Sequence, residues 1–294
     1  MATTATATWA QPLAHSIRKN GADRAASWVQ LATVTPAGRP AVRTVVHRGV
    51  ITVAPLSEPV LSFVTDARSG KVQQVAACDW GEAAWYFGVT REQWRIAGRL
   101  GVVMAAGHVG FRHPLWTAEA LERARRAAWV RMSDAGRAQF AWPHPGRDRA
   151  AADADGASFI RSLPLAAGEA GPGTAAEPPA PPAAGDPRHA PDGCGLLDAC
   201  AAELAPDGSS AGGGAGAGAA PADGAAAAAS DEAPPVTDAL LLEAAYANFC
   251  LLLLQPDSCD WLCLKFAPTQ RRAVHELVAG EDGSRSWRVR EVNP

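Results

Sequence analysis

A long stretch of low-complexity sequence is the feature that most limits what this 294-residue chain can fold into. From Pro164 to Pro235 the sequence consists largely of Ala, Gly and Pro, and residues 211–229 contain no residue type other than Ala, Gly, Pro and Asp. Such a segment buries too little apolar surface to offset the entropy lost on ordering, so we expect it to be disordered.

The two regions that flank this insertion carry fold-like sequence, and we expect them to form one domain. A long insertion is tolerated because the entropy of closing a loop grows slowly with its length. We therefore divide the chain into an N-terminal part of a barrel, residues 1–163, an Ala/Gly/Pro-rich insertion, residues 164–236, and C-terminal strands that complete the barrel, residues 237–294.

Most of the flanking sequence is patterned for short strands. The clearest case is a β-hairpin over 28–46, in which WVQLATVT alternates apolar and polar residues before the turn PAGRP. Helical spacing predicts helices over 9–19, 69–78 and 118–132. Further strands are predicted over 50–53, 59–65, 83–87, 94–105, 247–254, 261–266, 272–278 and 287–292. Short strands with few helices predict a mainly β fold, a small barrel with flanking helices.

The apolar run ANFCLLLL, residues 247–254, is predicted to be a buried strand. Its short length and the following Gln255-Pro256-Asp257 favour a strand over a helix. We expect this strand to end before the proline and to be separate from the strand predicted over 261–266.

Two segments carry side chains suited to an anionic ligand. If the second strand of the hairpin bends at its end, Arg43 and Arg48 both reach one anion. The segment TDARSGK follows a strand and opens a helix, whose first-turn N–H groups favour an anion. Within it Ser69 is placed to cap the helix, Thr65 supplies a hydroxyl and Lys71 a full charge. Each feature alone fits an ordinary surface arginine or capped helix, but together they predict a phosphate site.

Several motifs resemble those of a known family. R-x-V-V-x-R, T-D-x-R-S-x-K and E-Q-x-R-I-x-G, with the C-terminal SWRVREVNP, resemble motifs of the pyridoxamine 5′-phosphate oxidase-like superfamily. WVQLATV, RTVVHRG and FCLLLL resemble more closely a subgroup found in cyanobacteria and plants. The resemblance implies a split β-barrel that binds flavin mononucleotide (FMN) as its cofactor and forms a homodimer.

The resemblance also implies roles for single residues. Arg43 and Arg48, with Val45 between them, would flank the flavin and its phosphate. Ser69 and Lys71 would hold that phosphate.

Other residues would contact the rest of the cofactor. Thr65 would meet the ribityl chain or the ring. Gln93, whose amide donates and accepts together, would meet the pyrimidine edge of the flavin across a dimer seam. Ser133 would lie near a polar contact from the second subunit, and either Arg271 or Arg272 would lie near the flavin.

Two departures from the family pattern bear on activity. Gly70 stands where family oxidases have an arginine before the lysine, which makes Arg68 the candidate replacement. Trp116, Ala120 and Ala124 stand where true pyridoxamine phosphate oxidases hold their substrate's phosphate with Tyr, Arg and Ser. The second departure predicts poor binding of vitamin B6 phosphates, because the cation and hydroxyls are missing.

The favoured interpretation is an FMN-binding oxidoreductase with an unassigned small-molecule substrate. The alternatives are a true pyridoxamine/pyridoxine 5′-phosphate oxidase and a non-catalytic flavin or tetrapyrrole-binding protein. No side chain is a clear acid, base or nucleophile, so the catalytic residues stay unassigned. His47 is interpreted as a structural residue of its strand.

Composition argues against several other classes. A net charge of −3 and 19% charged residues indicate neither nucleic acid nor a membrane as partner. Arg125, Arg126 and Arg131 are interpreted as a solvated helix face. The six cysteines include no CxxC pair, which predicts reduced thiols and no metal site. No apolar run is long enough for a transmembrane helix, and we expect a cytoplasmic protein.

Overall fold

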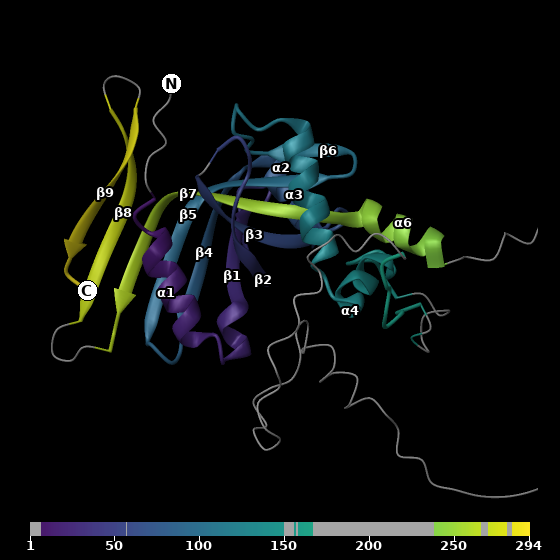
Figure 1. Ribbon diagram of the computed structural model, residues 1–294, viewed down its shortest axis with the longest axis horizontal. Coiled ribbons are helices and arrows are strands. Elements are labelled where there is room, and N and C mark those ends of the chain that lie inside the picture. The colour runs from purple at the N-terminus through teal and green to yellow at the C-terminus, as the bar shows by residue number, and fades with distance from the viewer. Residues whose placement is uncertain are drawn as a thin grey trace, which may run out of the picture.

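A computed structural model of the chain is shown in Figure 1. It describes residues 7–56, 58–149, 156, 158–166, 238–265, 270–280 and 284–294. The predicted disorder of the insertion concerns residues that lie almost entirely outside these ranges, so it stays a prediction.

The described residues form one nine-stranded antiparallel sheet that closes into a barrel. Its strands are β1 Trp28–Val34, β2 Pro40–Thr52, β3 Pro59–Asp66, β4 Trp80–Phe87, β5 Glu92–Met104, β6 Gly107–Gly110, β7 Phe249–Cys263, β8 Arg271–Ala279 and β9 Arg285–Val292. The strand order is β6-β5-β4-β1-β2-β3-β7-β8-β9, and an additional β5–β7 pairing closes a six-stranded barrel. The predicted mainly β barrel with flanking helices is confirmed.

Strand β7 closes the barrel although it comes after the insertion in sequence. It pairs with β3 through residues 249–254 and with β5 along nearly its whole length. Its last residues, Ser258 to Cys263, pair with β8. Leu251 to Leu254 are buried, and burial of each such leucine contributes about 1.5–3 kcal/mol.

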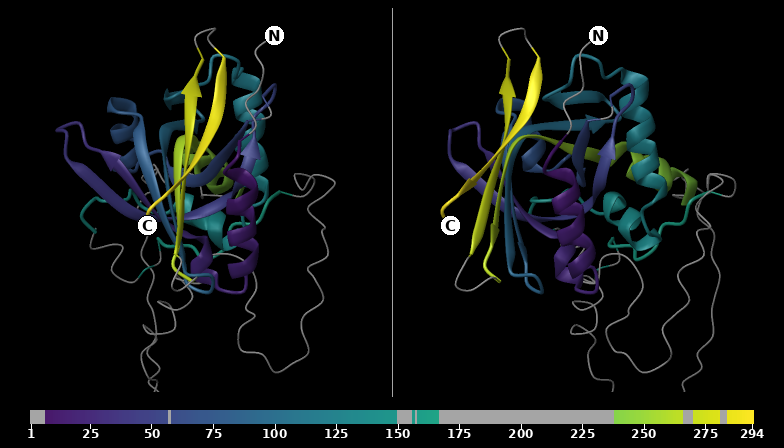
Figure 2. Two further views of the ribbon diagram at one scale, coloured as in Figure 1. Left: turned by 90° about the vertical axis from the view of Figure 1, so that its left-hand side faces the viewer. Right: turned by 60° about the vertical axis from the view of Figure 1, so that its left-hand side comes forward.

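The helices surround the barrel. They are α1 Ala10–Asn20, α2 Gly70–Ala77, α3 Ala118–Val130, α4 Asp134–Ala138 and α6 Asp238–Asn248. In Figure 1, α3, α4 and α6 lie at the end of the barrel where β7 begins, and the β8–β9 hairpin lies at the opposite side. The right-hand view of Figure 2 shows that hairpin projecting beside the barrel.

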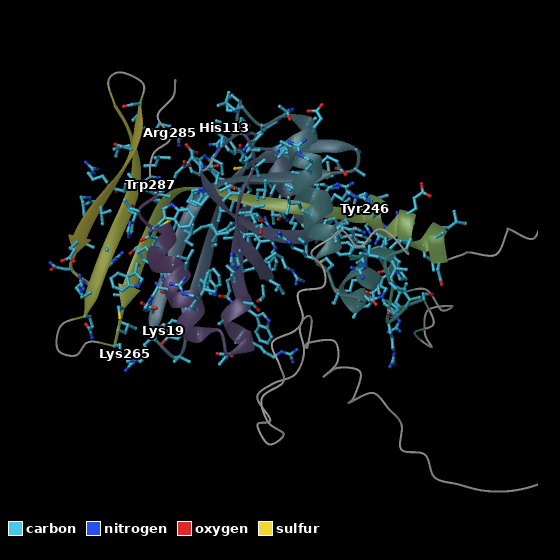
Figure 3. All side chains as sticks on the ribbon, viewed as in Figure 1. Lys19, His113, Tyr246, Lys265, Arg285 and Trp287 are labelled. Carbon is cyan, nitrogen blue, oxygen red and sulfur yellow. The ribbon has the colours of Figure 1, made fainter. Side chains whose placement is uncertain are left out.

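The main core lies inside the barrel and beneath α1. Leu31, Phe63, Trp85 and Trp94 are buried there, and α1 adds Leu13 to the same cluster. The β8–β9 hairpin reaches this core through Trp287, labelled in Figure 3, whose ring lies 6.3 Å from that of Trp9. The N-terminal helix and the C-terminal hairpin are therefore packed together.

Two predicted strand breaks are wrong, because each strand continues through a bulge. Residues 50–53 were predicted as a separate strand, but β2 runs on to Thr52 with a register shift between His47 and Gly49. Strand β7 likewise passes through Pro256, and Asp257 is the extra residue opposite β5. Gly98 makes this possible, since a Cβ there would lie 2.0 Å from the Gln255 carbonyl oxygen.

Two further predictions need correction, and one short strand was missed. Ala247 and Asn248 end α6 rather than open the strand, and the short β6 was not predicted. The strand predicted over 261–266 is the end of β7, which stops at Cys263, and Phe266 lies outside the described residues.

Arg125 does not belong to a solvated face, because its side chain is buried. Its guanidinium donates to the carboxylate of Glu122 and to the carbonyl oxygens of Tyr246 and Phe249. It also lies 4.0 Å from the ring centre of Tyr246, which is labelled in Figure 3. Arg125 thereby joins α3 to α6 and to the start of β7.

Among the described residues, no helix combines the length and hydrophobicity needed to cross a membrane. The four described cysteines, Cys78, Cys250, Cys259 and Cys263, are free thiols.

Candidate functional site

A group of polar side chains gathers where β2, the end of β3 and the start of α2 meet. We call it the cradle, and it consists of Arg43, Thr65, Ser69, Lys71 and Gln74. The tight turn between β3 and α2 brings Thr65 and Ser69 to Lys71. Gln74 lies one turn further along α2 and accepts a hydrogen bond from Arg43 of β2. Four of the five were predicted from the sequence.

Lys71 is the centre of the cradle. Its Nζ atom donates to Thr65 Oγ1 at 2.8 Å and to Ser69 Oγ at 3.2 Å. The two hydroxyl oxygens are 3.1 Å apart. Ser69 occupies the N-cap position of α2 with extended backbone, but its side chain makes no cap hydrogen bond. The predicted capping bond is therefore wrong, and the hydroxyl faces the ammonium group instead.

Arg43 enters the cradle from β2. Its Nη2 donates to Gln74 Oε1 at 2.7 Å, and its Nη1 donates to Thr33 Oγ1 at 2.7 Å. Nη1 also donates to the carbonyl oxygens of Leu31 and Ala41. All of these partners are neutral.

Gln74 was not predicted from the sequence. Its Oε1 atom accepts from both Arg43 and Thr33, the latter at 2.6 Å. The available signal was its position three residues after Lys71, which puts both side chains on the same side of α2.

The cradle holds positive charge without a carboxylate of its own. Within the described residues, neither Arg43 nor Lys71 has an acidic side chain at ion-pair distance. Burial lowers the pKa of Lys71, and the nearby charge of Arg43 lowers it further, while Asp66 acts in the opposite sense. Burial also lowers the pKa of Arg43. Since burying like charges is costly, this arrangement fits an anionic ligand such as the phosphate of a flavin nucleotide.

Arg68 does not supply the missing cation. Its Nε and Nη2 donate to the Asp66 carboxylate at 2.9 and 2.7 Å, and Nη2 also donates to the Trp142 carbonyl oxygen at 3.0 Å. Arg68 is thus held by Asp66 and by the segment that comes after α4, rather than by the cradle.

Two further residues of β2 were predicted to flank the flavin. Val45 is buried in the barrel core, and Arg48 lies at the bulge, half-buried. His47 packs with its ring 4.7 Å from Trp85 and 5.9 Å from Phe63. Burial lowers the pKa of His47 to about 4, so the side chain is neutral at physiological pH.

A second polar group lies on the outer face of the sheet. Gln93 on β5 is aligned with Leu262 on β7, which is aligned with Arg272 on β8, so all three share one face. Asp260 accepts from Arg272 Nε at 2.9 Å and from Nη2 at 2.6 Å. It also lies 3.9 Å from the Nη1 atom of Arg95. No hydrogen bond in the described chain connects this group to the cradle.

Two other predicted site residues, Arg271 and Ser133, lie outside both the cradle and the polar group around Gln93. Arg271 alternates with Arg272 in β8 and pairs with Glu291 at 2.6 Å, so Arg272 is the arginine that shares a face with Gln93. Ser133 is the N-cap of α4, where its Oγ accepts from the backbone N–H of Gly136 at 3.2 Å.

Comparison with known proteins places the described fold in a family. The family described as "Pyridoxamine 5′-phosphate oxidase, FMN-binding domain" matches residues 6–104, which contain the cradle and Gln93. A structure of a pyridoxamine 5′-phosphate oxidase-related, FMN-binding protein from Nostoc punctiforme superposes with a TM-score of 0.59 at 28% identity, covering 99% of this chain and 100% of the other. The chain belongs to the pyridoxamine 5′-phosphate oxidase-like family of FMN-binding split barrels.

Two further proteins share part of this similarity. Pyridoxine/pyridoxamine 5′-phosphate oxidase 2 of Arabidopsis thaliana is 34% identical over 140 residues, which cover 48% of this chain and 64% of that protein. This chain therefore spans less than two thirds of the length of the Arabidopsis protein. PhzG from Burkholderia lata matches 97% of this chain and 89% of its own with a TM-score of 0.51. At 14% identity that likeness shows the fold alone.

Trp116, Ala120 and Ala124 stand where the family resemblance predicts that true oxidases hold a B6 phosphate, and in this chain they pack in an apolar cluster. Trp116 and Ala120 are buried, and Ala124 is half-buried against the same apolar cluster. That cluster includes Leu251 and Leu253 of β7. These three side chains pack α3 and its approach onto the barrel. They carry no cation and no hydroxyl, and the indole N–H of Trp116 is buried.

Proposed function

We propose that this chain is an FMN-dependent oxidoreductase that works as a homodimer on a substrate still to be identified. The observation that carries the proposal is that the cradle holds two cations, Arg43 and Lys71, whose hydrogen-bond partners among the described residues are all neutral. Both cations belong to the part of the chain that matches the FMN-binding domain of the family.

In this proposal the cradle binds the phosphate end of the cofactor. The Lys71 ammonium and the hydroxyls of Thr65 and Ser69 are the donors, and Arg43 adds charge from β2. When bound, the flavin supplies the redox chemistry, and the protein supplies orientation and electrostatics.

The homodimer is supported by the outer face that carries Gln93. Trp28, Val42, Trp80 and Tyr86 are between 40% and 68% exposed, and all four lie on this face of β1, β2 and β4. A patch of large apolar side chains on one face is typical of an interaction surface. A second copy seated there would bring its Gln93 and Arg272 toward the first copy.

A B6-phosphate oxidase is the second candidate, favoured by the similarity to the Arabidopsis protein. The burial of Trp116 and Ala120 opposes it. The test incubates the FMN-loaded protein with pyridoxine 5′-phosphate and detects the aldehyde product by mass spectrometry. Formation of the aldehyde on the timescale of minutes would favour this candidate over ours.

The test of the proposed site compares FMN with riboflavin, which lacks the phosphate. Binding of each to the cofactor-free protein is measured by quenching of flavin fluorescence. A charge-assisted hydrogen bond contributes about 1.5–3 kcal/mol, so Lys71→Met should weaken FMN binding by about 10- to 150-fold. Riboflavin binding should not change.

Lys19→Met is the matched control, because Lys19, labelled in Figure 3, is exposed on α1, a helix that contributes no residue to the cradle. It should leave the affinity for both flavins unchanged. Equal FMN affinity in wild-type protein and Lys71→Met would overturn the assignment of the phosphate site.

A further inference from the structure

Two side chains accept hydrogen bonds from the same edge of the Arg43 guanidinium. Its Nη1 donates to Thr33 Oγ1 at 2.7 Å, and its Nη2 donates to Gln74 Oε1 at 2.7 Å. The two acceptor oxygens lie only 2.6 Å apart, so together they occupy the edge formed by Nη1 and Nη2. A guanidinium group is planar and presents its N–H groups in a fixed geometry, so two adjacent acceptors fix its orientation. Thr33 and Gln74 therefore form a two-point clamp on Arg43.

The clamp requires a neutral acceptor at Gln74. The Thr33 hydroxyl has one hydrogen, and Gln74 Oε1 at 2.6 Å is a nearer acceptor for it than the Ala41 carbonyl oxygen at 3.4 Å. Oε1 thus accepts from the Thr33 hydroxyl and from Arg43 Nη2 together. With the amide turned over, its NH2 group would face both donors. The arginine is therefore held by an amide oxygen, which leaves its charge in place.

The clamp leaves the other edge of the guanidinium without a partner in the described chain. The remaining contacts of Nη1 are with the carbonyl oxygens of Leu31 and Ala41. Among the described residues, neither Nε nor the Nη2 hydrogen on its side has a hydrogen-bond partner. Two parallel N–H groups of this kind match two oxygens of one phosphate. The charge of Arg43 is also close enough to Lys71 to lower the pKa of that ammonium group.

We propose that Thr33 and Gln74 are positioning residues, which hold Arg43 so that its Nε–Nη2 edge binds the phosphate of the cofactor. The inference rests on the proposed function, namely that the cradle binds this phosphate. A phosphate monoester carries about −1.5 to −2 charges at pH 7, so its affinity depends on both cations of the cradle. A carboxylate in place of the Gln74 amide would hold the arginine equally well but would offset its charge. The clamp therefore favours a phosphorylated flavin over an unphosphorylated one.

The first experiment removes the acceptor on α2 and keeps the charge of Arg43. Wild type and Gln74→Met, both full-length and cofactor-free, are titrated with FMN and with riboflavin by isothermal calorimetry. Loss of the clamp should weaken FMN binding about 5- to 10-fold and leave riboflavin binding unchanged, because only FMN carries the phosphate. An equal loss for both flavins, or no loss for either, would overturn the positioning role.

The second experiment keeps the acceptor and adds a negative charge. Gln74→Glu should weaken FMN binding by at least about tenfold, because the carboxylate pairs with Arg43 and repels the phosphate. Gln73→Glu is the matched control, since Gln73 is the preceding residue, is exposed, and undergoes the same change of charge. It should change the affinity for FMN by less than about threefold. If both glutamate variants weakened FMN binding to the same extent, net charge rather than the clamp would be the cause, and the inference would be wrong.

A pair of substitutions at Thr33 tests the clamp from β1. Thr33→Val removes the hydroxyl and keeps the shape, so the preference for FMN over riboflavin should fall about 3- to 10-fold. Thr33→Ser keeps the hydroxyl and should retain the preference. A thermal melt checks that each variant is folded, and the Thr33 pair decides the question if the Gln74 variants do not fold.

The two proposals fail in different ways. If the folded Gln74 and Thr33 variants all keep the wild-type preference for FMN, the positioning role is wrong and the phosphate site stands. If wild-type protein itself binds FMN and riboflavin equally, the proposed phosphate site is wrong, and the positioning role is wrong with it.

Discussion

Two regions of this molecule hold buried or partly buried cations, and the cations differ in their hydrogen-bond and charge partners. Arg125, at the junction of α3 and α6, has a carboxylate, two carbonyl oxygens and an aromatic ring as partners. Lys71, in the cradle, has two hydroxyls as its hydrogen-bond partners and the charge of Arg43 nearby. The first arrangement is complete within the fold, whereas the second leaves a positive charge that, in the proposed function, the phosphate of the cofactor would offset. The contrast separates a cation kept for stability from one kept for binding.

The largest expected effect is a loss of stability when Arg125 is replaced, and it tests whether this cation stabilises the fold. Arg125→Met should lower the free energy of unfolding by about 3 kcal/mol, because the carbonyl oxygens of Tyr246 and Phe249 lose their donor. Urea denaturation measures the change. Arg126→Met, at an exposed position one residue later, should stay within about 0.5 kcal/mol of wild type. If the two substitutions changed the free energy of unfolding equally, Arg125 would not be a specifically stabilising residue.

The next effect is a loss of stability at acid pH caused by His47, a buried side chain that is neutral in the fold. The pKa of His47 is lowered to about 4 in the fold from an ordinary 6.5, so the unfolded chain binds a proton more readily. The free energy of unfolding should therefore fall as the pH falls below 6.5, and this loss should be complete below the folded pKa. Between about pH 7 and pH 5 the loss from this group is about 2 kcal/mol.

Comparison with His47→Leu isolates that contribution. The variant should lose less stability than wild type between the same pH values, while His15→Gln, at an exposed position, should follow the wild-type curve. Parallel curves for wild type and His47→Leu would show that His47 does not cause the acid sensitivity.

The smallest effect is expected for the cradle itself. In cofactor-free protein, Lys71→Met should leave the free energy of unfolding unchanged or raise it by up to about 1 kcal/mol, because it removes a partly buried charge that faces Arg43. Urea denaturation in phosphate-free buffer measures this. A loss of about 2 kcal/mol or more would mean that Lys71 resembles Arg125 and stabilises the fold.

Four of the five cradle residues could be anticipated from the sequence, because they lie in two short motifs. Thr65, Ser69 and Lys71 fall within seven positions, and a strand-to-helix turn brings such residues together. Gln74 was missed because a lone glutamine on a helix carries no signal of its own. The separation of Gln93 from the cradle depends on which face of the barrel each strand presents, and that requires the closed sheet.

Other misses have identifiable physical causes. Pro256 suggested the end of a strand, but a bulge against Gly98 accommodates it, and Gly98 gave no distinct signal in isolation. Arg125 was assigned to solvent because of its charge. Its spacing of four residues from both Leu121 and Trp129, which are buried, did indicate the inner face of α3.

The position of β7 in the chain has a consequence for biosynthesis. Strands β3 and β5 are the two partners that β7 joins, and they are translated before residues 164–236. Until the ribosome has also made residues 249–263, both strands are unpaired sheet edges, which are sites of unwanted association. The nascent N-terminal part must therefore wait for its closing strand, and this interval is the stage at which a chaperone would have most to protect.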